Sequence, residues 1–132
     1  MLGTFQQTSL RIEVDAPATA IRDSILRPEQ LQEWLWPQRT REKLPEQLYE
    51  GLSYTSAIGP VLIHHRIDRA EPHCLRVLLS QGIDGFHEWY WGEGWVQSRL
   101  EGVSLLPLSL SHTVNLLRLR EFLSHKNRQH AE

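Results

Sequence analysis

The sequence predicts an α+β fold in which a curved antiparallel sheet of about seven strands wraps around one long C-terminal helix. Residues 4–15 alternate between polar and apolar side chains, as a half-exposed strand does. Short runs rich in β-formers follow Pro45 and are separated by Gly, Pro or Asp, which favours antiparallel neighbours. The last long segment carries an apolar stripe at helical spacing.

The closing helix is expected over residues 108–126, and it needs a partner surface to bury its apolar stripe. A hydroxyl at Ser109 or Ser111 is expected to cap its N-terminus. His112 and Asn115 project from the inward arc, either as polar anchors for a ligand or as partners of the first-turn N–H groups. The second interpretation is favoured because both lie near the N-terminus. The stripe itself comprises Leu116, Leu119, Phe122 and Leu123.

Two short helices are expected between the first strand and the rest of the sheet. Asp15-Ala16-Pro17 is typical of a helix start, with the Asp15 carboxylate as the cap. Arg27 precedes a proline and therefore ends the first helix, and Pro28 begins the second, which ends at Trp36-Pro37. The core-facing positions of the pair are Ile21, Ile25, Leu31, Trp34 and Leu35.

Six strands are expected after Pro45, joined by short connections into a meander. They span residues 46–50, 53–58, 61–70, 74–81, 85–91 and 95–103. Two inner faces are clear from the alternation: Val61, Ile63, His65 and Ile67 in one strand, and Leu75, Val77 and Leu79 in the next. The chain 1–132 is expected to be a single domain, with residues 127–132 as a polar, frayed tail.

The composition is that of a globular protein, with 40% hydrophobic and 23% charged residues. A formal net charge of −2, without a clustered basic face, gives no basis for nucleic acid as a partner. We recognise no signal peptide and no run of the roughly 20 apolar residues that a membrane span needs. The single cysteine, Cys74, fits a reducing compartment. We therefore expect a cytoplasmic protein without a membrane span, either a monomer or a weak homodimer.

Several segments together resemble a known family. They are the opening strand ending in Val14-Asp15-Ala16-Pro17, the helix pair with Trp34, Leu52-Ser53-Tyr54-Thr55, the strand from Val61 to Glu71-Pro72, Gly85-Phe86-His87-Glu88-Trp89, and the closing helix from Thr113 to Leu123. Over residues 4–124 the chain resembles the START-like, or SRPBCC, superfamily, with its birch-pollen-allergen-like, polyketide cyclase/dehydrase-like and coenzyme-Q-binding-like proteins. The resemblance implies a helix-grip fold with a cavity between the sheet and the C-terminal helix. Members bind lipids, isoprenoids, polyketides or other apolar molecules there, and some are enzymes. The chain is short for the superfamily, so a small cavity is expected.

His65 is a candidate for chemistry because it lies among apolar residues on the expected inner face. A buried histidine orients a ligand or transfers a proton, although a single structural hydrogen bond in the core is the favoured interpretation. Tyr54 joins the candidates if it faces inward. Arg99 shares a strand face with polar residues and is expected to be solvated.

The segment 86–91 places His87, Trp89 and Trp91 on one face of a strand and Phe86, Glu88 and Tyr90 on the other. We expect the first row to face inward, because Glu88 is costly to bury unpaired. An aromatic wall lines a small-molecule pocket or only stabilises the sheet through cross-strand pairs, and the sequence favours neither interpretation.

Other kinds of chemistry find little support. His64 and His65 are adjacent in a strand and point to opposite faces, and no HExxH or paired CxxC motif is present, so we expect no metal site. Cys74 lies opposite the apolar face of its strand with no sign of an activating base. Phosphate-binding and nucleophile-elbow motifs are absent, and we expect no cofactor.

Three functions fit these observations. The first is non-enzymatic binding of a hydrophobic small molecule (a lipid, isoprenoid, quinone or polyketide-like ligand) in the cavity. The second is a cyclase or dehydratase with His65 or His112 as general base and Tyr54 as donor. The third is a protein-interaction module with a filled core and exposed aromatics such as Trp36 and Tyr90. The expected ligand-binding residues are Trp34, Tyr54, Ile63, His65, Val77, His87, Trp89, Trp91, His112, Asn115, Leu116 and Leu119.

Overall fold

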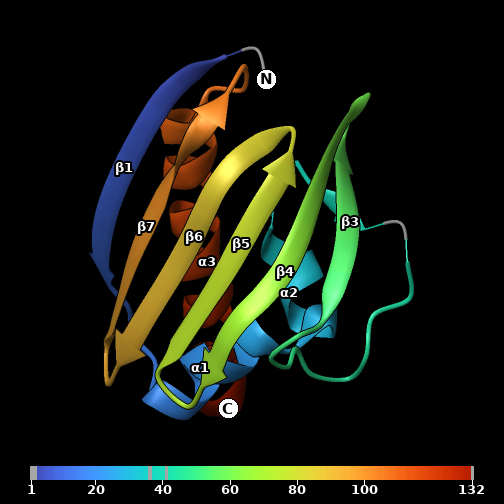
Figure 1. The fold of residues 1–132 in the computed structure, drawn as a ribbon. Helices are drawn as coiled ribbons and strands as arrows, with labels where there is room; N and C mark the ends of the chain where they lie inside the picture. The colour runs from blue at the N-terminus through green and yellow to red at the C-terminus, as the bar shows by residue number, and fades with distance from the viewer. Residues whose placement is uncertain (1–2, 36, 41, 132) are drawn as a thin grey trace.

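A computed structural model describes residues 3–35, 37–40 and 42–131. Its strands are β1 (Thr4–Glu13), β2 (Arg39–Thr40), β3 (Ser53–Ile58), β4 (Val61–Glu71), β5 (Cys74–Gln81), β6 (Ile83–Gly92) and β7 (Trp95–Ser104), and its helices are α1 (Ala18–Leu26), α2 (Pro28–Trp34) and α3 (Leu108–Ala131). All strands form one antiparallel sheet in the order β1-β7-β6-β5-β4-β3-β2. The sheet curves around α3, with α1 and α2 on the same side (Figure 1). The predicted helix-grip α+β fold is confirmed.

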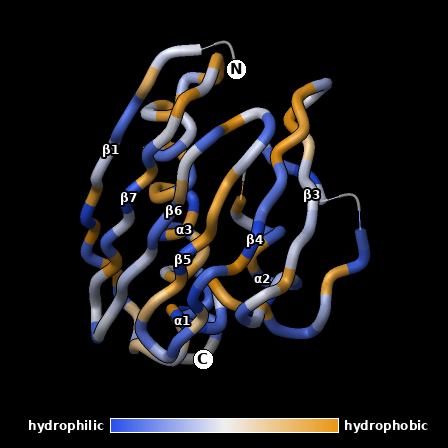
Figure 2. Tube along the Cα trace, in the orientation of Figure 1, coloured by the Kyte–Doolittle hydropathy of each residue, from blue (hydrophilic) through white to orange (hydrophobic). Residues whose placement is uncertain are grey.

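The core lies between the inner face of the sheet and the three helices. Hydrophobic and hydrophilic positions succeed one another along the strands (Figure 2), and the buried apolar side chains are the inward ones. The inner row of β4 contains Ile63 and Ile67, at 0% and 1% exposure, and that of β5 contains Val77. The buried apolar residues of α3 are Leu108, Leu116, Leu119 and Leu123. Three of them belong to the predicted stripe, and its fourth member, Phe122, is only half-buried. None of the helices in the described part of the chain has the length and apolar character needed to span a bilayer.

The strand predicted over residues 46–50 is absent, and β2 is a two-residue strand that pairs with β3. Residues 46–50 contain one buried apolar side chain, Leu48, whose N–H donates to the carbonyl of Leu26 (2.8 Å). The neighbouring Tyr49 is 55% exposed. A single anchoring side chain packs a loop against α1 but cannot provide the alternation that a strand buries.

The turn between β5 and β6 is shorter than predicted. Gln81 takes a positive φ of 70°, so the chain reverses at Gln81-Gly82, and β6 begins at Ile83. Ile83, expected in the break between the two strands, is 3% exposed and belongs to the core. Positive φ is uncommon for a residue with a side chain, and the sequence pattern gives no sign of it.

Two glycines face each other where β6 and β7 pair. Gly85 is the partner of Gly102, and a Cβ atom at Gly85 would collide with the carbonyl oxygen of Glu101. A Cβ at Gly102 would lie 2.7 Å from the carbonyl oxygen of Asp84. The two backbones therefore approach more closely than side chains allow, at the end of the sheet where β6 bends over (Figure 1).

The N-terminus of α3 is held by β1 instead of by a serine of its own. The N–H of Leu108 donates to Oε1 of Gln6 (3.1 Å), and Nε2 of Gln6 donates to the carbonyl of Leu106 (2.8 Å). Ser111 donates its hydroxyl to the carbonyl of Leu108 (3.2 Å), and no first-turn N–H in the described part of the chain donates to Ser109 or Ser111. The predicted cap is therefore wrong. The helix also continues to Ala131, through the residues assigned to a frayed tail.

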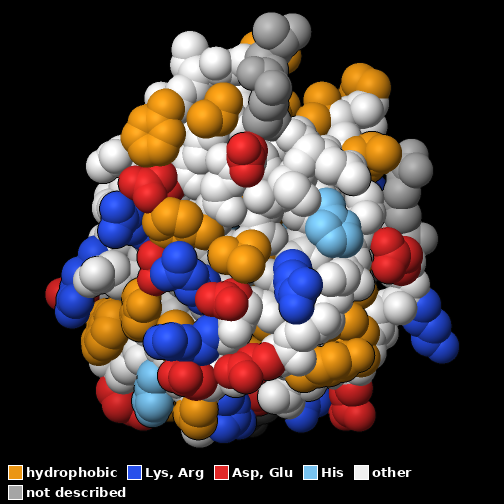
Figure 3. Space-filling model, in the orientation of Figure 1, with side chains coloured by type: hydrophobic (Ala, Val, Ile, Leu, Met, Phe, Trp, Pro, Cys, Tyr) orange, Lys and Arg blue, Asp and Glu red, His pale blue; other side chains and the backbone are white. Residues whose placement is uncertain are grey.

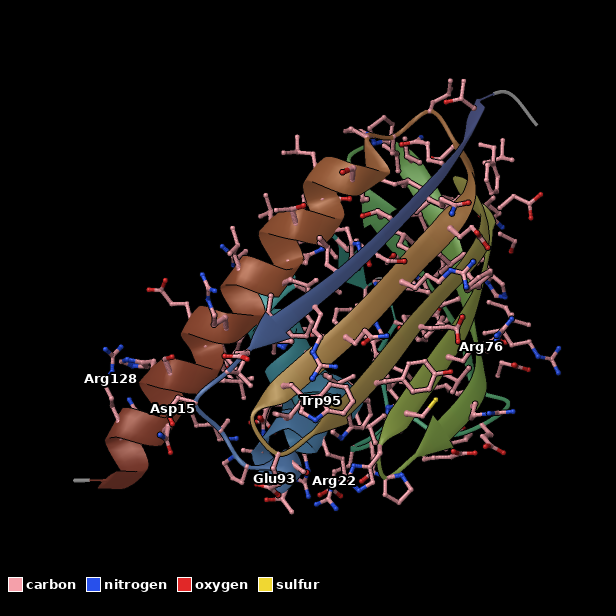
Figure 4. The ribbon with its side chains drawn as sticks, turned by 90° about the vertical axis from the view of Figure 1, so that its left-hand side faces the viewer. Asp15, Arg22, Arg76, Glu93, Trp95 and Arg128 are labelled. Atoms are coloured by element: carbon pink, nitrogen blue, oxygen red, sulfur yellow. The ribbon has the colours of Figure 1, made fainter. Side chains whose placement is uncertain are left out.

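The N-terminus of α1 is likewise capped from another element. The N–H of Ala18 donates to Oε1 of Glu93, in the turn between β6 and β7 (3.1 Å). Asp15 makes no cap: the N-cap residue is Pro17, which has no side-chain cap of its own. Figure 4 shows Asp15 and Glu93 on opposite sides of the chain entering α1. A carboxylate stabilises a helix N-terminus whichever segment of the chain it comes from. The local sequence pattern therefore predicted the right kind of cap but the wrong residue, Asp15 instead of Glu93.

Replacing Glu93 with Ala is therefore expected to lower the unfolding free energy by about 1 kcal/mol, because the cap of α1 is lost. Asp15→Ala serves as the matched control and should change it by less than about 0.5 kcal/mol. Urea denaturation followed by circular dichroism measures both. A larger loss in Asp15→Ala than in Glu93→Ala would contradict the assignment.

Candidate functional site

A cavity of about 60 Å³ lies between the inner face of the sheet and the first half of α3. It extends from Ile25 of α1 and Leu48 to the loop ends at Gln38 and Leu106. Seven of the predicted ligand-binding residues line it: Tyr54, His65, Val77, His87, Trp89, His112 and Asn115. The prediction that His87 and Trp89 face inward, away from Phe86, Glu88 and Tyr90, is confirmed.

The other five predicted site residues lie outside the cavity lining. Ile63, Trp91, Leu116 and Leu119 are at most 1% exposed and pack within the core. Trp34 is also buried; its ring meets Trp89 edge-on at 5.7 Å, and its Nε1 donates to the carbonyl of Ser24 (2.9 Å). Trp36 and its expected role as a lid lie outside the described residues.

Two of the larger hollows, of about 610 and 520 Å³, are open grooves on the helical side of the molecule. The first runs between α2 and α3 beside Glu33, Arg118 and Glu121, and the second between α1 and α3 beside Asp23 and Lys126. Both are bordered by solvated charges, whereas the smaller internal cavity is where buried polar groups converge. The cavity is therefore the candidate site.

Four polar side chains from four elements meet beside the cavity. Nε2 of His87 (β6) and Nε2 of His112 (α3) each lie 2.9 Å from Oγ of Ser98 (β7). Ser98 also donates to the carbonyl of Glu88 (3.1 Å), and Nδ1 of His112 lies 3.2 Å from Oγ1 of Thr8 (β1). The rings of His87 and His112 meet edge-on at 5.3 Å. His112 is thus a structural link as well as a lining residue.

A second polar group lies on β3 and β4. Nε2 of His65 is 2.7 Å from Oγ of Ser56, and the ring of Tyr54 stacks on the imidazole at 4.6 Å between centroids with an angle of 5°. Tyr54 and His65 are direct partners across the antiparallel pair, which explains the stacking. The hydrogen bond expected for a structural His65 is present, and the ring also borders the cavity.

All three inward histidines are neutral at pH 7. Burial lowers the pKa of His112 to about 4. Burial, and to a smaller extent the charge of His64, lowers the pKa of His65 to about 4. Burial also holds the pKa of His87 well below its ordinary 6.5, with His112 and His65 adding to the effect. Burial raises the pKa of Tyr54, so its hydroxyl keeps its proton.

Among the residues that the structure describes, no Lys, Arg, Asp or Glu lines the cavity. Charged side chains gather on the outer face of the sheet instead, where both signs are intermixed (Figure 3). There Glu88, at 8% exposure, accepts from the Tyr90 hydroxyl (2.8 Å) and lies 3.5 Å from Arg76. Arg99 is on the same face, 3.1 Å from Glu101, as the sequence predicted. No cluster that could hold a metal ion occurs among the described residues.

Sequence reasoning missed three of the hydroxyls that organise the site: Ser98, Ser56 and Thr8. Ser98 alternates with Val96 and Leu100, which are 0% and 5% exposed, so its inward position is legible from the strand pattern. A serine between two buried aliphatic residues needs an internal partner, and that requirement points toward the histidines.

No family model matches the chain, and no curated protein matches it. Solved structures with the same fold include protein CV1439 from Chromobacterium violaceum, with a TM-score of 0.72 and 18% identity over 89% of this chain and 96% of that one. CalU16 from Micromonospora echinospora has a TM-score of 0.67 and 17% identity over 95% and 80% of the two chains. DynU16, from the dynemicin biosynthetic locus, has a TM-score of 0.64 and 15% identity; the match covers 89% of this chain and 47% of that one. What these proteins share is the helix-grip fold.

Ser98→Ala is expected to lower the unfolding free energy by about 2–4 kcal/mol, because it removes the shared partner of two buried imidazoles and of a carbonyl. Ser56→Ala is the matched control. This serine is equally buried, at 1% exposure, but among the described residues its hydroxyl bonds only to His65, and a loss of about 1 kcal/mol is expected. Chemical denaturation at pH 7 measures both. Equal losses would contradict the central role given to Ser98.

The unfolding free energy is expected to fall as the pH is lowered from 6.5 to 4. In the unfolded chain each imidazole takes up a proton near pH 6.5, whereas His65 and His112 stay neutral until about pH 4. Proton binding therefore favours the unfolded state in this window, by about 3 kcal/mol for each histidine at its lower end. In His65→Gln the difference in unfolding free energy between pH 7 and pH 4.5 should shrink by about 2 kcal/mol. Urea denaturation at the two pH values measures it, and an undiminished difference would contradict the neutral, buried state of His65.

Proposed function

We propose that the chain is a START-like (SRPBCC) protein that binds an uncharged, largely apolar small molecule in the cavity between the sheet and α3. The observation that carries the proposal is the lining: its described residues form an apolar wall without a charged side chain, interrupted by a few inward polar groups. The element order and the helix-grip fold support the superfamily. CalU16 and DynU16, the latter from a biosynthetic locus, have this fold and fit a small-molecule role.

The size of the cavity limits the ligand. About 60 Å³ is less than the roughly 150 Å³ of an apolar cavity that binds benzene, so the cavity as it stands has room for a few water molecules. A compact ligand enters if lining side chains move apart. A lipid, isoprenoid, quinone or polyketide-like molecule would place only one end inside. Pro37, Gln38 and Leu106 line the cavity at the loop ends and are the residues such a molecule would displace.

The enzymatic alternative, a cyclase or dehydratase, has less support. Both nitrogens of His112 are engaged, by Thr8 and Ser98, so its use as a general base would break the link between α3 and the sheet. With a pKa of about 4, His65 is a weak base near neutral pH, where an efficient general base has a pKa close to the working pH. Binding requires neither group to change its protonation state.

Leu100→Ala is expected to increase the affinity for toluene at least about tenfold, because Leu100 lines the cavity and its truncation enlarges it. Leu123→Ala is the matched control, a buried leucine of α3 outside the lining, and should leave binding at this cavity unchanged. Both variants should lose about 2–5 kcal/mol of unfolding free energy. Titration followed by two-dimensional amide NMR measures the affinity and locates the ligand.

In wild-type protein, shifts confined to the cavity residues, or a ligand retained in native mass spectrometry after purification, would support the proposal. If saturating toluene shifts no cavity residue in wild type or in Leu100→Ala, the proposal is wrong.

A further inference from the structure

The protons of the Ser98 cluster can be assigned by counting donors and acceptors. A serine hydroxyl has one proton to donate and two lone pairs to accept with. The Ser98 hydroxyl contacts the carbonyl of Glu88, which can only accept, and one nitrogen each of His87 and His112. All three contacts are hydrogen bonds only if Ser98 donates to Glu88 and accepts from both imidazoles. Both histidines therefore carry their proton on Nε2.

This assignment makes Nδ1 an acceptor in both rings. In His112 the acceptor is used, because the Thr8 hydroxyl donates to Nδ1 across 3.2 Å. In His87, Nδ1 has no hydrogen-bond partner among the residues that the structure describes. The fully buried side-chain nitrogens without a hydrogen-bond partner in this part of the chain are Nε of Arg27, Nε of Arg76 and Nε1 of Trp91. Nδ1 of His87 is not among them, so this atom is not fully buried. It retains accessible surface, and His87 borders the cavity.

The surroundings of His87 determine which ligand suits this acceptor. Its ring packs on Trp89 at 4.5 Å between centroids, and the nearby wall is built from aliphatic residues such as Val77 and Leu100. The carboxylates of this region face the outer side of the sheet, as Glu88 does with Arg76. A carboxylate ligand would place its lone pairs against the lone pair of Nδ1. It would also bring a negative charge to a wall whose described residues include no cation, and an ammonium group would meet no carboxylate among them.

We infer that the cavity recognises an uncharged ligand through a hydroxyl group, which donates its hydrogen bond to Nδ1 of His87 while an aromatic or aliphatic body fills the apolar wall. This inference rests on the proposed binding function and specifies the class of ligand, an alcohol or a phenol. Ser98 is the positioning residue, because it fixes the tautomer and the ring orientation of His87. The same network that ties α3 to the sheet thereby presents one acceptor to the ligand.

The tautomer is testable in the wild-type protein without any ligand. Long-range proton–nitrogen NMR correlations of the imidazoles distinguish a protonated ring nitrogen from an unprotonated one. At pH 7 the expected spectrum has Nε2 protonated and Nδ1 unprotonated in both His87 and His112. A proton on Nδ1 of His87 would overturn the inference, because the ring would then present a donor to the cavity.

The ligand class is tested with phenol, toluene and benzoate, three probes on the same ring. Phenol and toluene differ by a hydroxyl in place of a methyl group, so their relative affinity isolates the hydrogen bond. The toluene-to-phenol ratio of Kd is expected to be about tenfold lower in His87→Phe than in wild type, the loss of one hydrogen bond. His64→Phe makes the same change on the outer face of β4 and should leave the ratio as in wild type. Benzoate should bind at least about a hundredfold more weakly than phenol at pH 7.

The outcomes separate the two proposals. If toluene and phenol bind but their ratio is the same in wild type and His87→Phe, the cavity binds ligands and the inference about His87 is wrong. If phenol perturbs the Nδ1 resonance of His87 in wild type and toluene does not, the inference is supported even where His87→Phe fails to fold. Benzoate that binds as tightly as phenol overturns it. If no probe binds in the cavity, the proposed function and the inference fall together.

Discussion

The position of α3 on the sheet depends on hydrogen bonds between the sheet and the first half of the helix. His112 of α3 contacts Thr8 of β1 and Ser98 of β7. The side-chain amide of Gln6 in β1 accepts from the N–H of Leu108 and donates to the carbonyl of Leu106, where the helix begins. In the second half of the helix the contact is apolar, through Leu116, Leu119 and Leu123. Hydrogen bonds are directional and the hydrophobic effect is not, so the polar half sets the position and angle of the helix. The cavity lies beside this polar half.

The sequence pattern predicted the elements that bury one continuous face. Alternation located β4 and β5, and the cost of burying Glu88 correctly oriented β6, with His87 and Trp89 inward. It failed where a position depends on a partner distant in the chain. Glu93 in place of Asp15 caps α1, and Gln6 in place of a local serine serves α3. A helix end needs a hydrogen-bonding group but does not specify which segment provides it.

The candidate site was predictable to a similar extent. Inward histidines and aromatics follow from strand periodicity, and seven of the expected residues line the cavity. The sequence does not show which of these side chains keeps an unused donor or acceptor. That depends on how donors and acceptors are matched among residues that meet only in the folded chain. Thr8 and Ser98 are 90 positions apart, and both contact His112. Ile63, Leu116 and Leu119 have the same periodicity as lining residues but fill the core, since periodicity identifies a face and not the space beside it.

The facing glycines of β6 and β7 influence the shape of the sheet but do not belong to the cavity lining. Gly85 and Gly102 allow two backbones to approach where side chains would collide, and neither glycine lines the cavity. The close approach of β6 and β7 at this end of the sheet therefore depends on two positions outside the cavity lining. Leu79 and Leu100, by contrast, line the cavity. The residues that shape this end of the sheet and those that line the cavity are therefore separate sets, so the lining can be varied without replacing either glycine.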